Sequence, residues 1–231
     1  TTASNNTAVG YQSLYANTTG IQNNAFGSGA LDANTTGNYN VAMGYVALGA
    51  NTTANANVGI GYASLFDNTT GANNTAIGFS SLENNTTAAN NTAIGYASLL
   101  ANTTGEQNVA IGMEAGKSQT TGFGSTVGSG NDSNNTFIGR HSGYSTTTSA
   151  NNTAVGYNSL EANTTGEQNT SVGASSMDAN TTGSFNSSIG YNSLGANTTG
   201  ARNAALGYSA LGVNTTGDFN VAVGMYSLDA N

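Results

Sequence analysis

Apolar and polar residues alternate along this chain in a unit of 17 residues. A glycine that follows an apolar residue marks each unit, and it recurs in two runs with a constant spacing of 17. The first run is Gly10, Gly27, Gly44, Gly61, Gly78, Gly95 and Gly112, and the second is Gly139, Gly156, Gly173, Gly190, Gly207 and Gly224. Gly128 lies between the runs, at spacings of 16 and 11. The pattern predicts 14 coils with one defect.

Each unit carries the signals of short strands rather than of a helix. The consensus is N-T-A-[VI]-G-Y-x-S-L-x-A-N-T-T-G-x-x, in which N-T-A-V-G-Y and S-L-x-A are strand-like and T-T-G is a turn signal. A helical unit would place apolar residues three and four apart over about ten residues. We therefore predict an all-β fold, a parallel β-solenoid in which each coil stacks on the previous one at about 4.8 Å.

In such a stack, equal positions of successive coils form columns along the axis. Two apolar columns are expected to fill a narrow interior. The column before the marker glycine contains Val9, Phe26, Met43, Ile60, Ile77, Ile94, Ile111, Val155, Val172, Ile189, Leu206 and Val223, with Val127 and Ile138 in the irregular part of the chain. The column four residues after the glycine contains Leu14, Leu31, Leu48, Leu65, Leu82, Leu99, Leu160, Leu194, Leu211 and Leu228, with Met177 at the same position.

Asparagine and alanine form further columns. Stacked asparagine amides are expected to hydrogen bond along the axis as ladders, and these ladders include Asn6, Asn23, Asn40 and Asn57, and Asn17, Asn34, Asn51 and Asn68. Alternation along the strand places the alanine of N-T-A-V-G on the face opposite the valine. We expect this alanine column to form a smooth outer face that another chain can approach.

The repeat divides the chain into residues 1–112, which are regular, 113–150, which are irregular, and 151–231, which are regular again. All three parts are expected to belong to one continuous solenoid domain. In the irregular part, Gly116 and Gly143 replace the leucine. This part is interpreted either as a bulge or tapered coil, or as a binding patch for a partner chain or glycan. The residues of such a patch are Lys117, Arg140, His141 and Tyr144.

Charge and composition exclude several classes of protein. The net charge is -8 with three basic residues, so the chain lacks the basic face that a nucleic-acid-binding protein needs. It has no cysteine, and no apolar run approaches the roughly 18 residues of a membrane span. Most acids fall into two columns, which are expected to face water. One contains Asp32, Glu83, Glu161, Asp178 and Asp229, and the other contains Glu106, Glu167 and Asp218.

Catalytic chemistry has little support in the sequence. His141 is the only histidine, and no nucleophile is assigned to it by spacing. The stretch G-M-E-A-G-K-S has three residues between its glycines, whereas a phosphate-binding loop needs four. Paired carboxylates such as Glu161 and Asp178 are expected to be solvated on the rod surface. We therefore predict no enzymatic activity, no cofactor and no metal site.

Repeats such as N-N-T-A-I-G-Y-A-S-L-L-A-N-T-T-G resemble the head repeats of trimeric autotransporter adhesins of the YadA type. They are also similar to the N-T-A-[IL]-G-Y-x-[AS]-L arrays of phage tail fibres. The resemblance covers essentially the whole chain. It implies a left-handed parallel β-roll, three chains side by side, and an adhesive or fibre role outside the cell, at a cell surface or on a virion.

The function expected from these observations is that of a structural, self-assembling fibre or adhesin segment with multivalent surface binding. The expected partners are two further copies of the chain, and copies stacked end to end, because Asn231 followed by Thr1 would restore an N-T-T unit. A host-surface glycan or protein is considered as a further partner. The alternatives are a phage tail-fibre shaft for host recognition and an ice-binding solenoid. The latter is disfavoured because Thr18 and Thr19 are adjacent and tend to face opposite ways.

Overall fold

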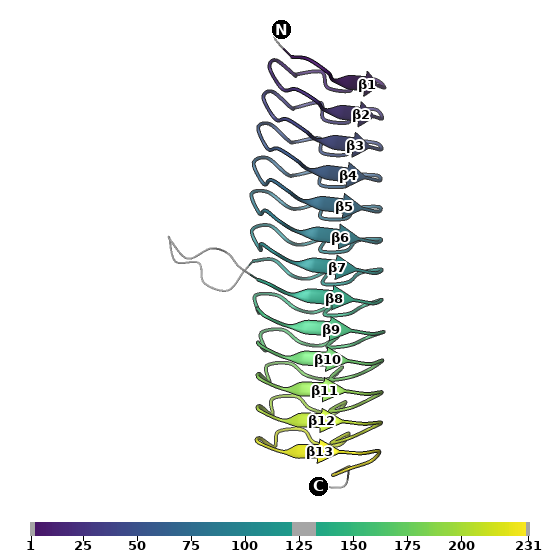
Figure 1. Cartoon of the computed structure of the whole chain (residues 1–231), viewed down its shortest axis with the longest axis vertical. Helices are drawn as coiled ribbons and strands as arrows, with labels where there is room; N and C mark the ends of the chain where they lie inside the picture. The colour runs from purple at the N-terminus through teal and green to yellow at the C-terminus, as the bar shows by residue number, and fades with distance from the viewer. Residues whose placement is uncertain (1–2, 122–132, 230–231) are drawn as a thin grey trace, which may run out of the picture.

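The computed structural model describes residues 3–121 and 133–229. They form an upright stack of thirteen strands in one parallel sheet that follows the order of the sequence (Figure 1). The strands are β1 (Thr7–Val9), β2 (Asn24–Phe26), β3 (Val41–Met43), β4 (Val58–Ile60), β5 (Thr75–Ile77), β6 (Thr92–Ile94), β7 (Val109–Ile111), β8 (Thr136–Ile138), β9 (Thr153–Val155), β10 (Thr170–Val172), β11 (Ser187–Ile189), β12 (Ala204–Leu206) and β13 (Val221–Val223). The predicted all-β parallel solenoid is confirmed.

The strands pair in register, each residue beside the one 17 positions later, as for Ala76 and Ala93. The exception is the pair β7 and β8, where Val109 faces Thr136, 27 residues later. The described part of the rod therefore has thirteen strands, with β8 paired directly with β7. Val127 and Gly128 lie outside the described residues.

The backbone outside the strands consists of turns. The S-L-x-A piece, expected as a second strand, is instead a turn in which the leucines have φ between 48 and 57. It still bonds to the next coil, because the Leu82 N–H donates to the Ser98 carbonyl at 3.0 Å. The marker glycine is required by its backbone conformation and by the close approach of the next coil. Gly10 has φ 136, and a Cβ there would lie 2.5 Å from the Gly27 carbonyl oxygen of the next coil.

The interior is lined by the middle residue of each strand and by the leucine column. Ala76, Ala93 and Leu82 are fully buried, whereas Leu228, in the last described coil, is 44% exposed. A three-residue strand directs only its middle side chain inward, and alanine leaves room for the leucine opposite. The leucine column thus lies inside, as expected.

The column before the marker glycine lies on the outer face, so its predicted place in the core is wrong. Each of these residues ends a strand and is either half-buried or exposed, and the exposed ones range from Ile77 at 36% to Val223 at 68%. The prediction of a smooth outer alanine face is wrong for the same reason. The alanine side of each strand faces the interior, and the side with the valine or isoleucine faces outward. The residues corrected are Val9, Phe26, Met43, Ile60, Ile77, Ile94, Ile111, Ile138, Val155, Val172, Ile189, Leu206 and Val223.

The two asparagine columns satisfy the polar interior in different ways. In one, each side-chain amide donates to the asparagine of the preceding coil, as Asn34 does to Asn17 at 3.0 Å and Asn51 to Asn34 at 2.9 Å. In the other, the side-chain oxygen of Asn6 accepts the backbone N–H of Asn23 at 2.8 Å. Because buried polar groups are costly unless they are hydrogen bonded, these columns hold the coils in register.

Candidate functional site

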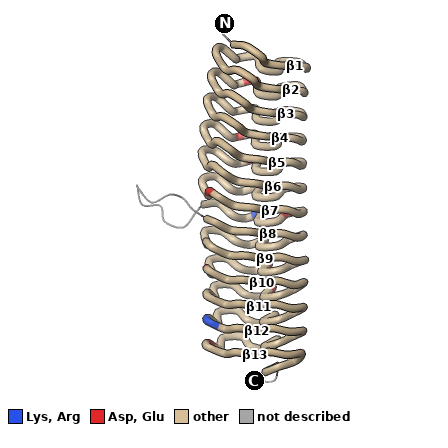
Figure 2. Tube along the Cα trace, in the orientation of Figure 1, with Lys and Arg blue, Asp and Glu red and all other residues tan. Residues whose placement is uncertain are grey.

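The junction between β7 and β9 gathers an unusual share of the chain's few charged residues. Glu114 follows β7, His141 follows β8 and Glu161 follows β9, so the three side chains stack on successive coils. His141 Nε2 lies 2.9 Å from Glu114 Oε2, and His141 Nδ1 lies 3.5 Å from Glu161 Oε1. Lys117 Nζ donates to Glu114 Oε1 at 2.7 Å. Charges elsewhere on the rod are sparse (Figure 2).

Three of the four residues of the predicted binding patch meet in this cluster. The His141 ring lies 5.2 Å from the Tyr144 ring, and Lys117 Nζ lies 5.5 Å from the centre of the same ring. Arg140 does not join them, because its guanidinium lies over Tyr157 at 5.6 Å. The patch therefore divides into a paired cluster and a separate arginine.

The contacts within the cluster shift the pKa values of two of its members, Glu114 and Lys117. Hydrogen bonding to Lys117, and to a lesser extent to His141, lowers the pKa of Glu114, and the same contact with Glu114 raises the pKa of Lys117. A neutral imidazole has one N–H, so only a protonated ring donates to both Glu114 and Glu161. The two carboxylates approach opposite nitrogens of His141 and do not converge on a shared point. The cluster is thus built to bind its own members.

No group of three histidine, aspartate or glutamate side chains in the described ranges is placed to hold a metal ion. The two predicted acid columns are on the surface but are partly covered. Burial raises the pKa of Glu167, and burial together with the Glu161 charge raises that of Asp178. Asp67 lies outside both columns, and its pKa is raised by burial and by the Glu83 charge. Two pairs of carboxylates, Glu161 with Asp178 and Asp67 with Glu83, thus lie close enough on neighbouring coils to repel each other.

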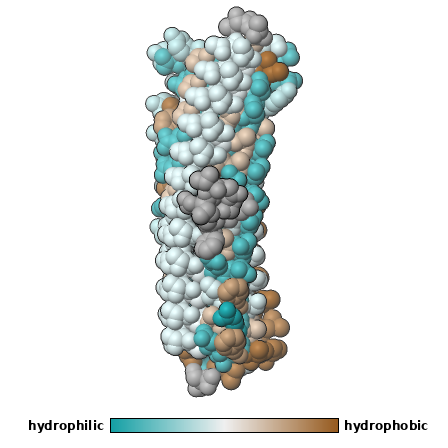
Figure 3. Space-filling view, turned by 90° about the vertical axis from the view of Figure 1, so that its left-hand side faces the viewer, coloured by the Kyte–Doolittle hydropathy of each residue, from teal (hydrophilic) through white to brown (hydrophobic). Residues whose placement is uncertain are grey.

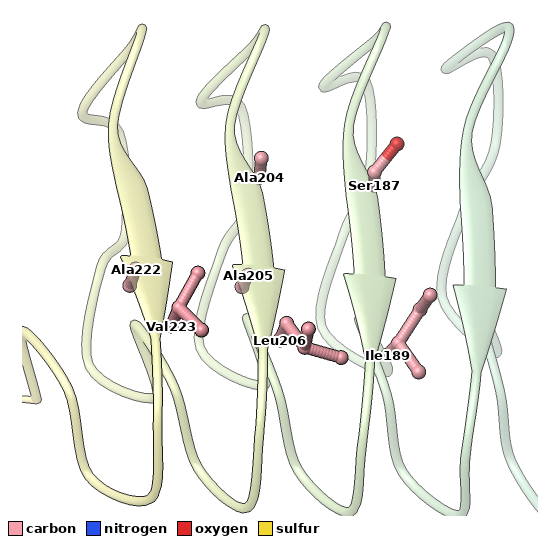
Figure 4. A pocket seen from close by; sticks show the side chains of 7 residues that line it. All are labelled: Ser187, Ile189, Ala204, Ala205, Leu206, Ala222 and Val223. Carbon is pink, nitrogen blue, oxygen red and sulfur yellow. The ribbon is translucent and has the colours of Figure 1, made fainter.

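The outer face of the sheet carries a continuous column of apolar residues, one at the end of each strand. In β1 to β13 the first and third residues point outward, and none of them is charged. Figure 4 shows the residues that line a shallow apolar hollow on this face, where Leu206 lies between Val223 and Ile189, and Ala204 and Ser187 lie at the other end of their strands. Ala204 and Ser187 are small residues at a position where most other strands carry threonine or valine, which leaves the hollow open.

Aromatic side chains form a second outward column, directly after the marker glycine. Tyr45, Tyr62, Phe79 and Tyr96 stack with ring centres 5.4, 4.7 and 5.6 Å apart. Their exposures lie near one half, from 48% for Phe79 to 54% for Tyr45. Because the faces of the rings contact one another, the rings present mainly their edges to solvent along the rod.

Threonine covers the turn side of the rod, which is the pale face in Figure 3. In the first threonine column the hydroxyl donates to the backbone of the next coil, as Thr18 does to Thr35 at 2.9 Å and Thr35 to Thr52 at 3.0 Å. The hydroxyls of this column therefore hold coils together. The second column, which includes Thr19 and Thr36, is exposed.

Two features of the surface and interior were missed by the sequence reasoning. Phe137 occupies the alanine column inside the junction, and the substitution of a large residue at a small position was the signal. Arg202 lies between Phe185 and Phe219, at 5.1 and 5.4 Å from the ring centres. These three residues occupy successive coils at one position that is often asparagine, which was again a visible departure from the repeat.

No protein-family model matches the chain, and neither the curated proteins nor the solved structures contain a significant match. In the described ranges, no helix is long and apolar enough to cross a membrane.

Proposed function

We propose that this β-solenoid repeat protein is a structural segment of an extracellular fibre or adhesin, and that it assembles as a homotrimer with parallel axes. The observation that carries the proposal is the uncharged outer face of the sheet. The strand-ending residues form an apolar stripe along thirteen coils, which at about 4.8 Å per coil is roughly 58 Å long. Soluble monomers rarely expose a continuous apolar surface of that extent.

Three chains with parallel axes would turn their apolar stripes toward a common axis. The regular spacing of the coils supports this arrangement, because a residue such as Ile77 would meet its own equivalents at the same height. Acidic residues favour the same orientation, since the carboxylates of the two acid columns would remain outside. The resemblance to YadA-type head repeats and tail-fibre arrays supports both the trimer and the adhesive or fibre role.

The trimer is tested by measuring the mass in solution. Analytical ultracentrifugation over a range of concentrations should give three times the chain mass of 23.0 kDa. The double substitution Ile77→Glu and Ile94→Glu should give a monomer, because it places charges in the interface without entering the core. The matched control Thr70→Glu and Thr87→Glu, on the turn side of nearby coils, should remain trimeric. A folded parent chain that stays monomeric at every concentration contradicts the proposal.

A further inference from the structure

The position that precedes the first interior asparagine of each coil changes character near the C-terminal end of the described rod. At five coils it is an exposed asparagine with positive φ: Asn5, Asn73, Asn90, Asn134 and Asn151. Asparagine tolerates this backbone better than most residues. At three successive coils the position is instead Phe185, Arg202 and Phe219, with φ of 61, 57 and 58. The remaining coils carry glutamine, tyrosine or alanine at this position, and it is at the C-terminal end that an arginine and two aromatic residues occupy successive coils.

The three side chains form a stack that is open to solvent. Arg202 lies between the two phenyl rings, at 5.1 Å from Phe185 and 5.4 Å from Phe219. Phe185 is 46% exposed and Phe219 is 70% exposed, and hydrophobic surface gathers toward the C-terminal end of Figure 3. Backbone bonds keep the stack in place, because Arg202 N–H donates to the Ser184 carbonyl at 3.0 Å and Phe219 N–H to the Ala201 carbonyl at 3.1 Å.

The guanidinium of Arg202 is left with free donors. The two phenyl rings flank its Cζ, and the guanidinium makes no hydrogen bond to any residue that the structure describes. No carboxylate in residues 3–121 and 133–229 is within ion-pair distance of it. The nearby Asp218 is directed elsewhere, since its Oδ1 accepts the Ala201 N–H at 2.7 Å. The edge of a guanidinium presents parallel donors that match the two oxygens of a carboxylate.

We propose that Phe185, Arg202 and Phe219 form a binding site for a singly charged sugar acid, such as a terminal hexuronic acid. The carboxylate would accept from Arg202, and the C–H groups of the sugar ring would cover the exposed Phe219 ring. One charge fits better than many, because Asp218 and Glu167 lie on adjoining coils and the chain has a net charge of -8. This site is separate from the sheet face, so it goes beyond the proposed trimer and does not depend on it.

Saturation-transfer NMR with the full chain tests the site, using methyl β-glucuronide as ligand and methyl β-glucoside as the matched uncharged probe. The glucuronide should receive saturation at its ring protons, and the glucoside should not. Arg202→Ala and Arg202→Lys should weaken glucuronide binding at least about tenfold, because lysine keeps the charge but loses the paired donors. Phe219→Ala should weaken it less. Arg140→Ala is the matched control, because Arg140 contacts a single ring, that of Tyr157. This variant should bind the glucuronide as the parent does.

Three outcomes overturn the proposal: no transfer to the glucuronide, equal transfer to both probes, or unaltered binding by Arg202→Ala. Displacement of the glucuronide by an equal concentration of inorganic sulfate would also overturn it, because the site would then recognise charge alone. Circular dichroism establishes that each variant is folded. Because each chain carries the whole site, a negative result here leaves the trimer mass unaffected, and a monomeric mass leaves this test intact.

Discussion

The regular coils at β4–β6 and the junction at β7–β9 fill the same interior in different ways. In the regular coils each leucine, such as Leu82, packs beside an alanine of the strands. At the junction, Gly116 and Gly143 replace two leucines and Phe137 replaces one alanine. A Cβ on Gly116 would lie 2.7 Å from the Phe137 ring, and one on Gly143 would also meet that ring. The comparison shows that the coil requires a filled interior, which either column can supply.

The hydrogen bonds of the buried polar side chains, in contrast to the apolar packing, are not all replaced at the junction. In the regular coils each asparagine of the ladder both donates and accepts, as Asn51 does. At the junction Gln119 and Thr146 occupy the ladder, and Gln119 Oε1 accepts instead from Asn135 at 3.1 Å. Asn102 Oδ1 and Thr146 Oγ1 are buried and have no hydrogen-bond partner in the described structure. The junction thus keeps its apolar packing but interrupts the amide ladder.

The strongest way to break this comparison is Phe137→Ala. The ring is fully buried between two glycines, which have no side chains to fill the space that it leaves. We expect the free energy of unfolding to fall by about 3–5 kcal/mol. Leu82→Ala in a regular coil should cost about 2–5 kcal/mol. Urea unfolding followed by circular dichroism measures both, and a loss below about 1 kcal/mol for Phe137→Ala would show that the junction is not packed as described.

A compensating exchange sharpens the same point. Gly143→Leu alone should lower the free energy of unfolding by about 1–3 kcal/mol, because the new side chain collides with the Phe137 ring. The backbone itself permits leucine, since Gly143 has φ 61 and the leucine column has φ between 48 and 57. Combined with Phe137→Ala, Gly143→Leu should recover most of the lost stability. Strictly additive losses in the double variant would contradict the exchange of volume between columns.

The repeat predicted the architecture because the same environment recurs in every coil. Parallel stacking, the interior leucines and the asparagine ladder all depend only on residues at fixed spacing. The spacing did not establish which side of the three-residue strand faces inward, so Ile77 was placed inside and Ala76 outside. That choice depends on the turn that follows, in which leucines such as Leu82 take a left-handed backbone that their side chains rarely adopt. Local propensity gives no signal for such a turn.

The candidate sites were predictable only where they break the repeat. Lys117 and His141 were noticed because charge is rare in this chain. The pairing of His141 with Glu114 could not be read from the repeat, because it joins residues 27 apart rather than 17, whereas Lys117 pairs with Glu114 within one coil. Arg202 was counted only as a cation, since its contact with Phe185 requires the column alignment that the structure provides.

Substitutions in the asparagine ladder should change stability differently in its regular part and in its interrupted part. Asn51→Ala removes a donor to Asn34 and Ala54 and an acceptor for Asn68, and should lower the free energy of unfolding by about 1–3 kcal/mol. Thr146→Val should be neutral or stabilising by up to about 1 kcal/mol, because the hydroxyl that it removes is buried without a partner. Thermal melts compare the two variants. Equal losses would mean that Thr146 Oγ1 has a partner in the folded chain.

The smallest effects concern two carboxylates whose pKa values are shifted in opposite directions. Glu114, at the junction, has a lowered pKa, and Asp178, in a regular coil, has a raised pKa. Lys117 and His141 lower the pKa of Glu114 from 4.5, so its ionised form stabilises the fold. The stabilisation is complete above pH 4.5, where the unfolded chain is ionised too, and is lost as the pH falls through the lower folded value. Burial and the Glu161 charge raise the pKa of Asp178 from 3.8, so its ionised form opposes folding at neutral pH.

Glu114→Gln should therefore be less stable than the parent at pH 7, and Asp178→Asn should be more stable. Both differences should stay under about 1 kcal/mol, because each group is partly open to solvent. Each should disappear as the pH falls, for Asp178→Asn once the pH is below 3.8, where both folded and unfolded parents are protonated. Urea unfolding of the three proteins between pH 3 and pH 7 measures the two curves. Curves of the same sign at pH 7 would show that the junction cluster adds nothing to what an ordinary surface carboxylate does on this rod.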